Sequence, residues 1–135
     1  NVHSEIYLSE CAWQASRGIR TDRYKYIETY DPGPFTRPAF ELYDLLTDPN
    51  EETNLAELLP DKIDSFKRKL TAWIHCKLGE REDPMKLVLR EEGLPFRKRI
   101  EKVLSQYDLT WDEWKANPQR DKIDKHVKEN RFLQK

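Results

Sequence analysis

Residues 40–56 read FELYDLLTDPNEETNLA, and the first half of this stretch decides the fold. Bulky apolar and acidic residues alternate over residues 40–45, a period of two that predicts a half-buried strand. Glu41 and Tyr43 fall on one face of this strand, and Phe40 and Leu42 fall on the other. A turn follows at residues 48–50, because proline has no backbone N–H to donate and Asp and Asn favour turns.

Three more strand patterns precede this stretch at short intervals. Residues 24–30 read YKYIETY, rich in the aromatic and β-branched residues that suit a pleated surface. Residues 31–34 contain two prolines and a glycine, which predicts a loop. Because the strands follow one another closely, an antiparallel meander is the simplest topology. The four strands are expected at residues 5–13, 17–21, 24–30 and 40–46.

The strongest helix signal in the chain covers residues 61–78. Apolar residues recur there at three- and four-residue spacing, from Ile63 to Ile74. Gly79 follows, at the position where a helix often takes a left-handed end residue. The apolar stripe needs a sheet to cover. We therefore expect an α+β fold, with a four-stranded antiparallel sheet packed against one long helix and followed by a helical C-terminal extension.

The chain divides into two expected parts, residues 1–85 and the helical extension 86–135. Residues 1–80 hold 10 basic and 14 acidic residues, whereas residues 81–135 hold 14 and 11, which makes the extension mildly basic. Thr110-Trp111-Asp112-Glu113 has the form of a capping box that opens a helix. Further helices are expected at residues 85–92, 96–107 and 118–132.

Composition excludes several classes of function. The net charge of −1 offers no basic field, so we expect no nucleic-acid partner. No apolar run approaches the roughly 18 residues of a membrane span, so we expect no membrane partner. The three histidines, His3, His75 and His126, have no neighbours at metal-ligand spacing, so we expect no metal site in this chain. A free-standing protein-interaction module, with the basic extension as its binding element, stays open as an alternative.

Two motifs carry a family resemblance. The ELYDL, DP and NLA elements of residues 41–56 follow a RGIRTDRYKYI run that begins at Arg17. This combination resembles the C-terminal subdomain of the sulfatases of the alkaline phosphatase superfamily. Within that superfamily it is most similar to the arylsulfatase and N-sulfoglucosamine sulfohydrolase-like group, where a similar ECxWQAxRGIRT run occurs. The resemblance covers about residues 4–85.

The resemblance implies where the chemistry of such a protein lies. Sulfatases hydrolyse sulfate esters or sulfamates with a formylglycine, made from Cys or Ser in a C-x-P-x-R or S-x-P-x-R motif, and with calcium. Both groups belong to a large N-terminal catalytic domain. Neither Cys11 nor Cys76 has proline two residues on and arginine four residues on. We therefore expect a C-terminal fragment with no catalytic residue, inactive alone, whose partner is the N-terminal catalytic domain of the same parent chain.

The resemblance also implies a substrate-binding role for residues of this subdomain, because its loops border the substrate pocket in the family. Trp13, Gln14 and Arg17 are the candidates: an aromatic ring can stack on a sugar, and Gln and Arg can bond its substituents. The alternative places Trp13 in the core and the arginine in an ion pair. A sheet that has lost its partner domain should also expose an apolar face, from which we expect homo-oligomers.

Overall fold

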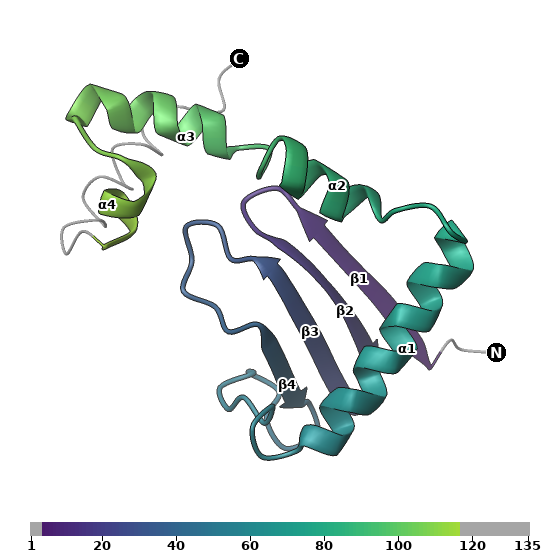
Figure 1. Cartoon of the computed structure of the whole chain (residues 1–135). Helices are drawn as coiled ribbons and strands as arrows, with labels where there is room; N and C mark the ends of the chain where they lie inside the picture. Colours follow the sequence, from purple (N-terminus) through teal and green to yellow (C-terminus); the bar gives the residue numbers. More distant parts are fainter. Residues whose placement is uncertain (1–3, 117–135) are drawn as a thin grey trace.

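The computed structural model describes residues 4–116 as a four-stranded sheet with one long helix across it and three shorter helices beyond (Figure 1). The predicted α+β class is confirmed. The elements are β1 (Glu5–Cys11), β2 (Ala15–Thr21), β3 (Tyr24–Asp31), β4 (Phe40–Asp44), α1 (Pro60–Leu78), α2 (Pro84–Glu91), α3 (Arg97–Leu104), the 3₁₀ turn η1 (Ser105–Tyr107) and α4 (Trp111–Ala116).

The sheet is the predicted antiparallel meander, in the order β1-β2-β3-β4. Two strands end earlier than expected: β1 stops at Cys11 and β4 stops at Asp44. The β1–β2 turn is therefore confined to residues 12–14, and β2 starts two residues before the predicted boundary. A register shift between Ala15 and Ser16 loosens the β2–β3 pairing beside this turn.

Helix α1 covers one face of the sheet, as predicted. Its Ile63, Phe66 and Leu70 side chains pack against Ile19, Tyr26 and Leu42, one residue from each of β2, β3 and β4. The rings of Tyr26 and Phe66 stack with centroids 5.5 Å apart. Leu42 is fully buried, and Glu41 and Tyr43 lie on the opposite face, as the alternation predicted. No helix within residues 4–116 covers this opposite face, which is called the open face below.

Asn54 ties the segment after β4 back to the strand. Its Oδ1 accepts from the N–H groups of Leu42 and Ala56, both at 3.0 Å, and its Nδ2 donates to the Phe40 carbonyl at 3.1 Å. Asp48 holds the preceding turn by accepting from the N–H of Glu52 at 3.0 Å. The acidic and amide residues of the motif thus satisfy backbone groups of β4 and of its following turn.

The remaining helices gather at the end of the sheet where the β1–β2 turn lies (Figure 1). Met85 of α2 and Leu94 pack on Ala15 of β2. Beyond them, α3 and α4 form a cluster of Ile100, Leu104, Trp111 and Trp114. The predicted capping box is confirmed, because Thr110 and Glu113 bond each other's backbone N–H groups. The helix predicted at residues 118–132 lies outside the described residues.

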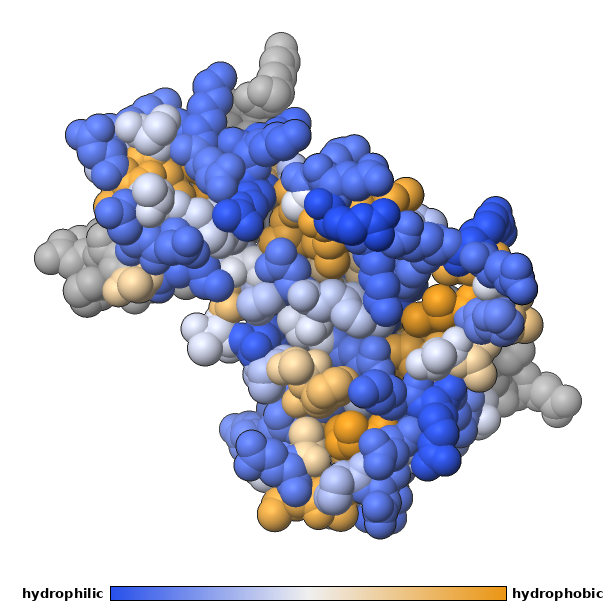
Figure 2. Space-filling view, in the orientation of Figure 1, coloured by the Kyte–Doolittle hydropathy of each residue, from blue (hydrophilic) through white to orange (hydrophobic). Residues whose placement is uncertain are grey.

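The surface drawn in Figure 2 is mainly hydrophilic, and its hydrophobic atoms form small separate patches. No helix within residues 4–116 is long and apolar enough to span a bilayer. The predicted boundary between residues 85 and 86 falls inside α2. The division of the chain into two parts stays a prediction.

Candidate functional site

The β1–β2 turn carries two of the three residues predicted to bind substrate. The loop of residues 32–39, which joins β3 to β4, packs against this turn. A Cβ atom on Gly33, whose φ is 59°, would stand 1.8 Å from the Trp13 carbonyl oxygen. Only glycine allows this approach. The turn and the loop of residues 32–39 therefore form one unit at this end of the sheet.

Trp13 is half-buried and faces the helical extension. Its ring stacks on Phe96 with centroids 5.1 Å apart, at the edge of the α3–α4 cluster. The indole thus links the sheet to the extension.

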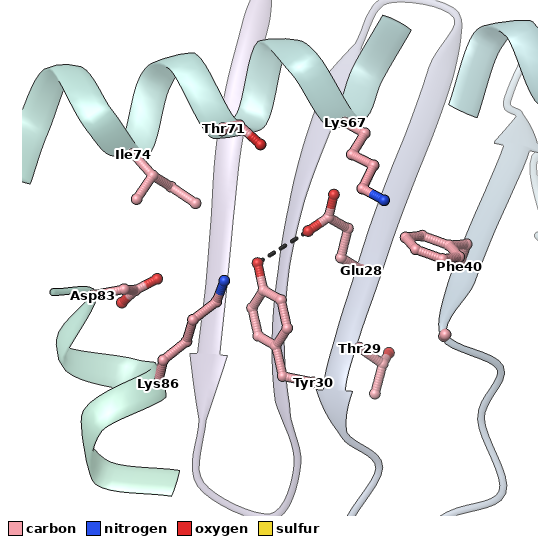
Figure 3. Close-up of a pocket in the computed structure, with 10 residues that line it drawn as sticks. Glu28, Thr29, Tyr30, Phe40, Lys67, Thr71, Ile74, Asp83 and Lys86 are labelled. Atoms are coloured by element: carbon pink, nitrogen blue, oxygen red, sulfur yellow. Dashed lines mark hydrogen bonds between the residues drawn. The ribbon is translucent and has the colours of Figure 1, made fainter. Parts of the chain in front are cut away.

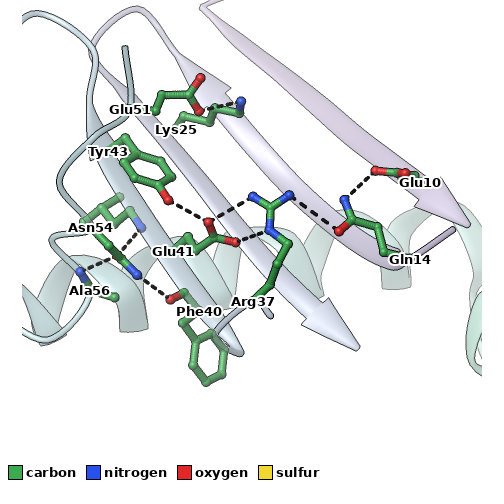
Figure 4. A network of polar contacts seen from close by, with 11 residues as sticks. Glu10, Gln14, Lys25, Arg37, Phe40, Glu41, Tyr43, Glu51, Asn54 and Ala56 are labelled. Atoms are coloured by element: carbon green, nitrogen blue, oxygen red, sulfur yellow. Dashed lines mark hydrogen bonds and ion pairs between the residues drawn. The ribbon is translucent and has the colours of Figure 1, made fainter. Parts of the chain in front are cut away.

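Gln14 is buried and turns toward the open face. Its Nε2 donates to Glu10 Oε2 at 2.8 Å, and its Oε1 lies 3.5 Å from the Nη1 of Arg37, which donates to it (Figure 4). Arg37 was not anticipated from the sequence. It comes from the proline-containing loop of residues 32–39, where no periodic pattern indicates which way a side chain points.

Arg17 points to the other face of the sheet. Its Nε and Nη2 donate to the two carboxylate oxygens of Asp83, at 3.0 and 2.6 Å, and its Nη1 donates to Ser9 Oγ at 2.7 Å. The Arg17 and Asp83 side chains are 12% and 6% exposed. Asp83 also caps α2 by accepting from the Met85 N–H at 2.9 Å. Arg17 and Gln14 both border one hollow of the open face, but the Arg17 guanidinium is bound to Asp83 and points away from the Gln14 amide. Whether these residues bind substrate stays a prediction.

Arg37 organises a polar network on the open face (Figure 4). It donates twice to Glu41, at 3.0 and 3.2 Å, and Tyr43 donates to the same carboxylate at 2.6 Å. The hydrogen bonds to Glu41 raise the pKa of the Arg37 guanidinium. Burial, together with the bond to Glu41, raises the pKa of Tyr43 to about 12. The phenol therefore stays a proton donor at neutral pH, and the Glu41 carboxylate has a full set of partners.

A hollow of about 280 Å³ lies beside this network. Its floor is formed by Leu8, Gly18 and Ile27 of the three neighbouring strands, and Gln14, Lys25 and Arg37 stand around it. No residue larger than glycine fits at position 18 without a shift of the backbone, because a Cβ atom on Gly18 would lie 2.4 Å from the Tyr26 carbonyl oxygen. Lys25 is neutralised by Glu51, at 2.6 Å. The hollow combines an apolar floor with polar groups at its rim, which is the general make-up of a small-molecule contact surface.

The residues of this chain do not fit the groups on which sulfatase chemistry depends. Within residues 4–116 no cluster of three or more His, Cys, Asp or Glu could hold a metal ion. The sequence contains neither of the two motifs that yield formylglycine.

Comparison with known proteins finds sulfatases. Over 79 residues the chain is 38% identical to arylsulfatase K of Bos taurus and, equally, of Canis lupus familiaris. This stretch of the chain is similar to part of a sulfatase. The match covers 56% of this chain but 14% of each relative, so the sulfatase likeness belongs to a small part of those proteins. The predicted resemblance to a sulfatase C-terminal subdomain is confirmed.

Solved structures and protein-family models were also compared with the chain. The chain aligns with the crystal structure of yidJ, a sulfatase candidate from Bacteroides fragilis, at 27% identity over 53% of this chain and 15% of that one. The TM-score is 0.41, too low to support an argument about the fold. No protein-family model matches the chain. The similarity to sulfatases therefore rests on the two arylsulfatases.

Proposed function

We propose that this chain is the C-terminal subdomain of a sulfatase that hydrolyses sulfate esters or sulfamates. The observation that carries the proposal is the 38% identity to two arylsulfatases over 79 residues. Because that match covers 14% of each arylsulfatase, the proposal assigns catalysis to the rest of a longer protein. Formylglycine and calcium would be held there, and the chain on its own would be inactive.

The partner proposed for this subdomain is the N-terminal catalytic domain of the same parent chain. The open face of the sheet supports a partner of this kind: Ile6 is 55% exposed, and Leu8 and Ile27 are only partly buried. Apolar side chains on a sheet face are stabilised when a second layer covers them. In the isolated chain, we propose that a second copy covers the same face.

The subdomain is further proposed to form one wall of the substrate cleft, through Trp13, Gln14 and Arg17. Gln14 and Arg17 both line the open-face hollow, and the amide of Gln14 is the one directed to that face, where it bonds Glu10 and Arg37. Trp13 and Arg17 are engaged with Phe96 and Asp83. Their contribution to the wall would include holding the turn and β2 in place.

Gln14→Ala in the full-length parent tests the proposed wall. One lost hydrogen bond of about 1 kcal/mol predicts a KM for an aryl sulfate raised about fivefold, with kcat little changed, because binding rather than chemistry is affected. Gln106→Ala, at an exposed position in η1, is the matched control and should leave KM unchanged. An unchanged KM in the folded Gln14→Ala enzyme would remove Gln14 from the cleft wall.

A further inference from the structure

A second cavity lies on the helix-covered face, in the gap between α1 and α2 (Figure 3). Its volume is about 290 Å³. Two strands form its floor, because Glu28 of β3 pairs directly with Phe40 of β4 and Tyr30 follows Glu28 on the same face. Helix α1 forms one wall through Lys67 and Thr71, one helical turn apart. Lys86 of α2 stands on the other side.

The carboxylate on the floor already has its hydrogen-bond donors. Glu28 is buried, and its two oxygens accept from the phenols of Tyr26 at 2.6 Å and Tyr30 at 3.0 Å. Burial and the neighbouring carboxylate raise the pKa of both phenols, so both remain protonated. The second carboxylate of the lining, Asp83, is held by Arg17.

The two lysines differ from these acids in what they contact. Lys67 Nζ lies 5.1 Å from the centroid of the Phe40 ring, and Lys86 Nζ lies 5.2 Å from that of Tyr30. Among residues 4–116, neither ammonium has a carboxylate partner in an ion pair. They point from opposite sides toward the Glu28–Tyr30 pair (Figure 3). The charged groups of the lining that have no ion-pair partner are therefore both hydrogen-bond donors.

The charges of the lining lead to the same conclusion. The lining has two cations, Lys67 and Lys86, and two anions, Glu28 and Asp83, but the anions are already held, Glu28 by two phenols and Asp83 by Arg17. Ammonium groups without a partner bind oxyanions through charge-assisted hydrogen bonds. The aromatic faces of Phe40 and Tyr30 and the Ile74 side chain add apolar surface beside them. A cavity of this volume is at the small end for ligand sites and admits about one ring.

We propose that this cavity binds a small ligand whose oxyanion group, a sulfate or a carboxylate on an aromatic or sugar ring, lies between Lys67 and Lys86. The oxyanion accepts hydrogen bonds from the two ammoniums, and the ring packs against Phe40 and Ile74. The site is built from residues of this chain alone, so it does not depend on the activity of a longer protein.

Isothermal titration of the 135-residue chain tests the site, with 4-nitrophenyl sulfate, inorganic sulfate and uncharged benzyl alcohol as probes at constant ionic strength. The aryl sulfate is expected to bind saturably and more tightly than the other two. Lys67→Gln and Lys86→Gln should each weaken it about tenfold, the effect of losing one charge-assisted hydrogen bond.

Lys77→Gln is the matched control, because it removes one exposed positive charge from the same helix α1 away from the cavity. It should leave the affinity unchanged, and all three variants should unfold at the wild-type midpoint. Equal affinities of the Lys67, Lys86 and Lys77 variants, or heats that do not saturate, would overturn the proposal. If inorganic sulfate binds as tightly as the aryl sulfate, the proposed packing of the ligand ring against Phe40 and Ile74 would be wrong.

Discussion

Asp83→Ala is expected to destabilise the chain by about 4 kcal/mol, since breaking a buried ion pair costs about 3–5 kcal/mol and loss of a helix cap about 1 kcal/mol. The change leaves the Arg17 guanidinium buried without its partner and removes the acceptor for the Met85 N–H. Urea unfolding measures the loss. The neighbouring Glu82→Ala is the control: its pair with Arg90 is exposed, so this variant should unfold close to the wild-type urea midpoint. Equal losses in the two variants would show that the Arg17–Asp83 pair does not hold α2 to the sheet.

The Arg17–Asp83 pair also makes the free energy of unfolding depend on pH in a direction that can be predicted. Burial acts to raise the pKa of the Asp83 carboxyl, but the hydrogen bonds from Arg17 and Met85 outweigh it and leave that pKa lowered. The unfolded carboxyl titrates near pH 3.9. The stability contributed by Asp83 is therefore present above about pH 4 and is lost as the pH falls through the folded pKa. The difference in unfolding free energy between wild type and Asp83→Asn should shrink below about pH 4.

Gly33→Ala is expected to cost about 3 kcal/mol, from strain at positive φ and from a forced backbone shift. The new Cβ atom would lie 1.8 Å from the Trp13 carbonyl oxygen, so the β1–β2 turn and the loop that carries Arg37 must move apart. Urea unfolding again gives the magnitude. Gly93→Ala controls for the backbone strain, because Gly93 has φ of 74° but the nearest atom, in the Arg97 side chain, lies 3.9 Å from the Cβ position. If the two variants lose the same stability, the contact between turn and loop contributes nothing.

The regular elements of this fold could be predicted because each has a local pattern. The alternation over residues 40–45 predicted β4 and the faces of Glu41 and Tyr43, and the three- and four-residue spacing of apolar residues predicted α1. The predicted ends of β1 and β4 lie too far along the chain, because apolar residues continue past the last paired residue, with Trp13 after β1 and Leu45 and Leu46 after β4. The 118–132 helix and the domain boundary stay predictions.

The surroundings of the candidate site could not be predicted in the same way. Arg17 and Asp83 are 66 residues apart, and no local pattern pairs them. Arg37 reaches Gln14 and Glu41 from an irregular loop, and that loop takes its place from the close approach of Gly33 to Trp13. Sequence reasoning gave Trp13, Gln14 and Arg17 through a family resemblance, and only the fold shows that Gln14 and Arg17 serve opposite faces of the sheet.

Aryl sulfate hydrolysis, measured in parallel for the full-length parent protein and for the 135-residue chain, tests the central claim most directly. The account predicts that the parent is active and carries a formylglycine, detected by intact mass, and that the chain alone shows no hydrolysis above buffer. A parent with neither formylglycine nor sulfatase activity, or hydrolysis by the isolated chain, would contradict it.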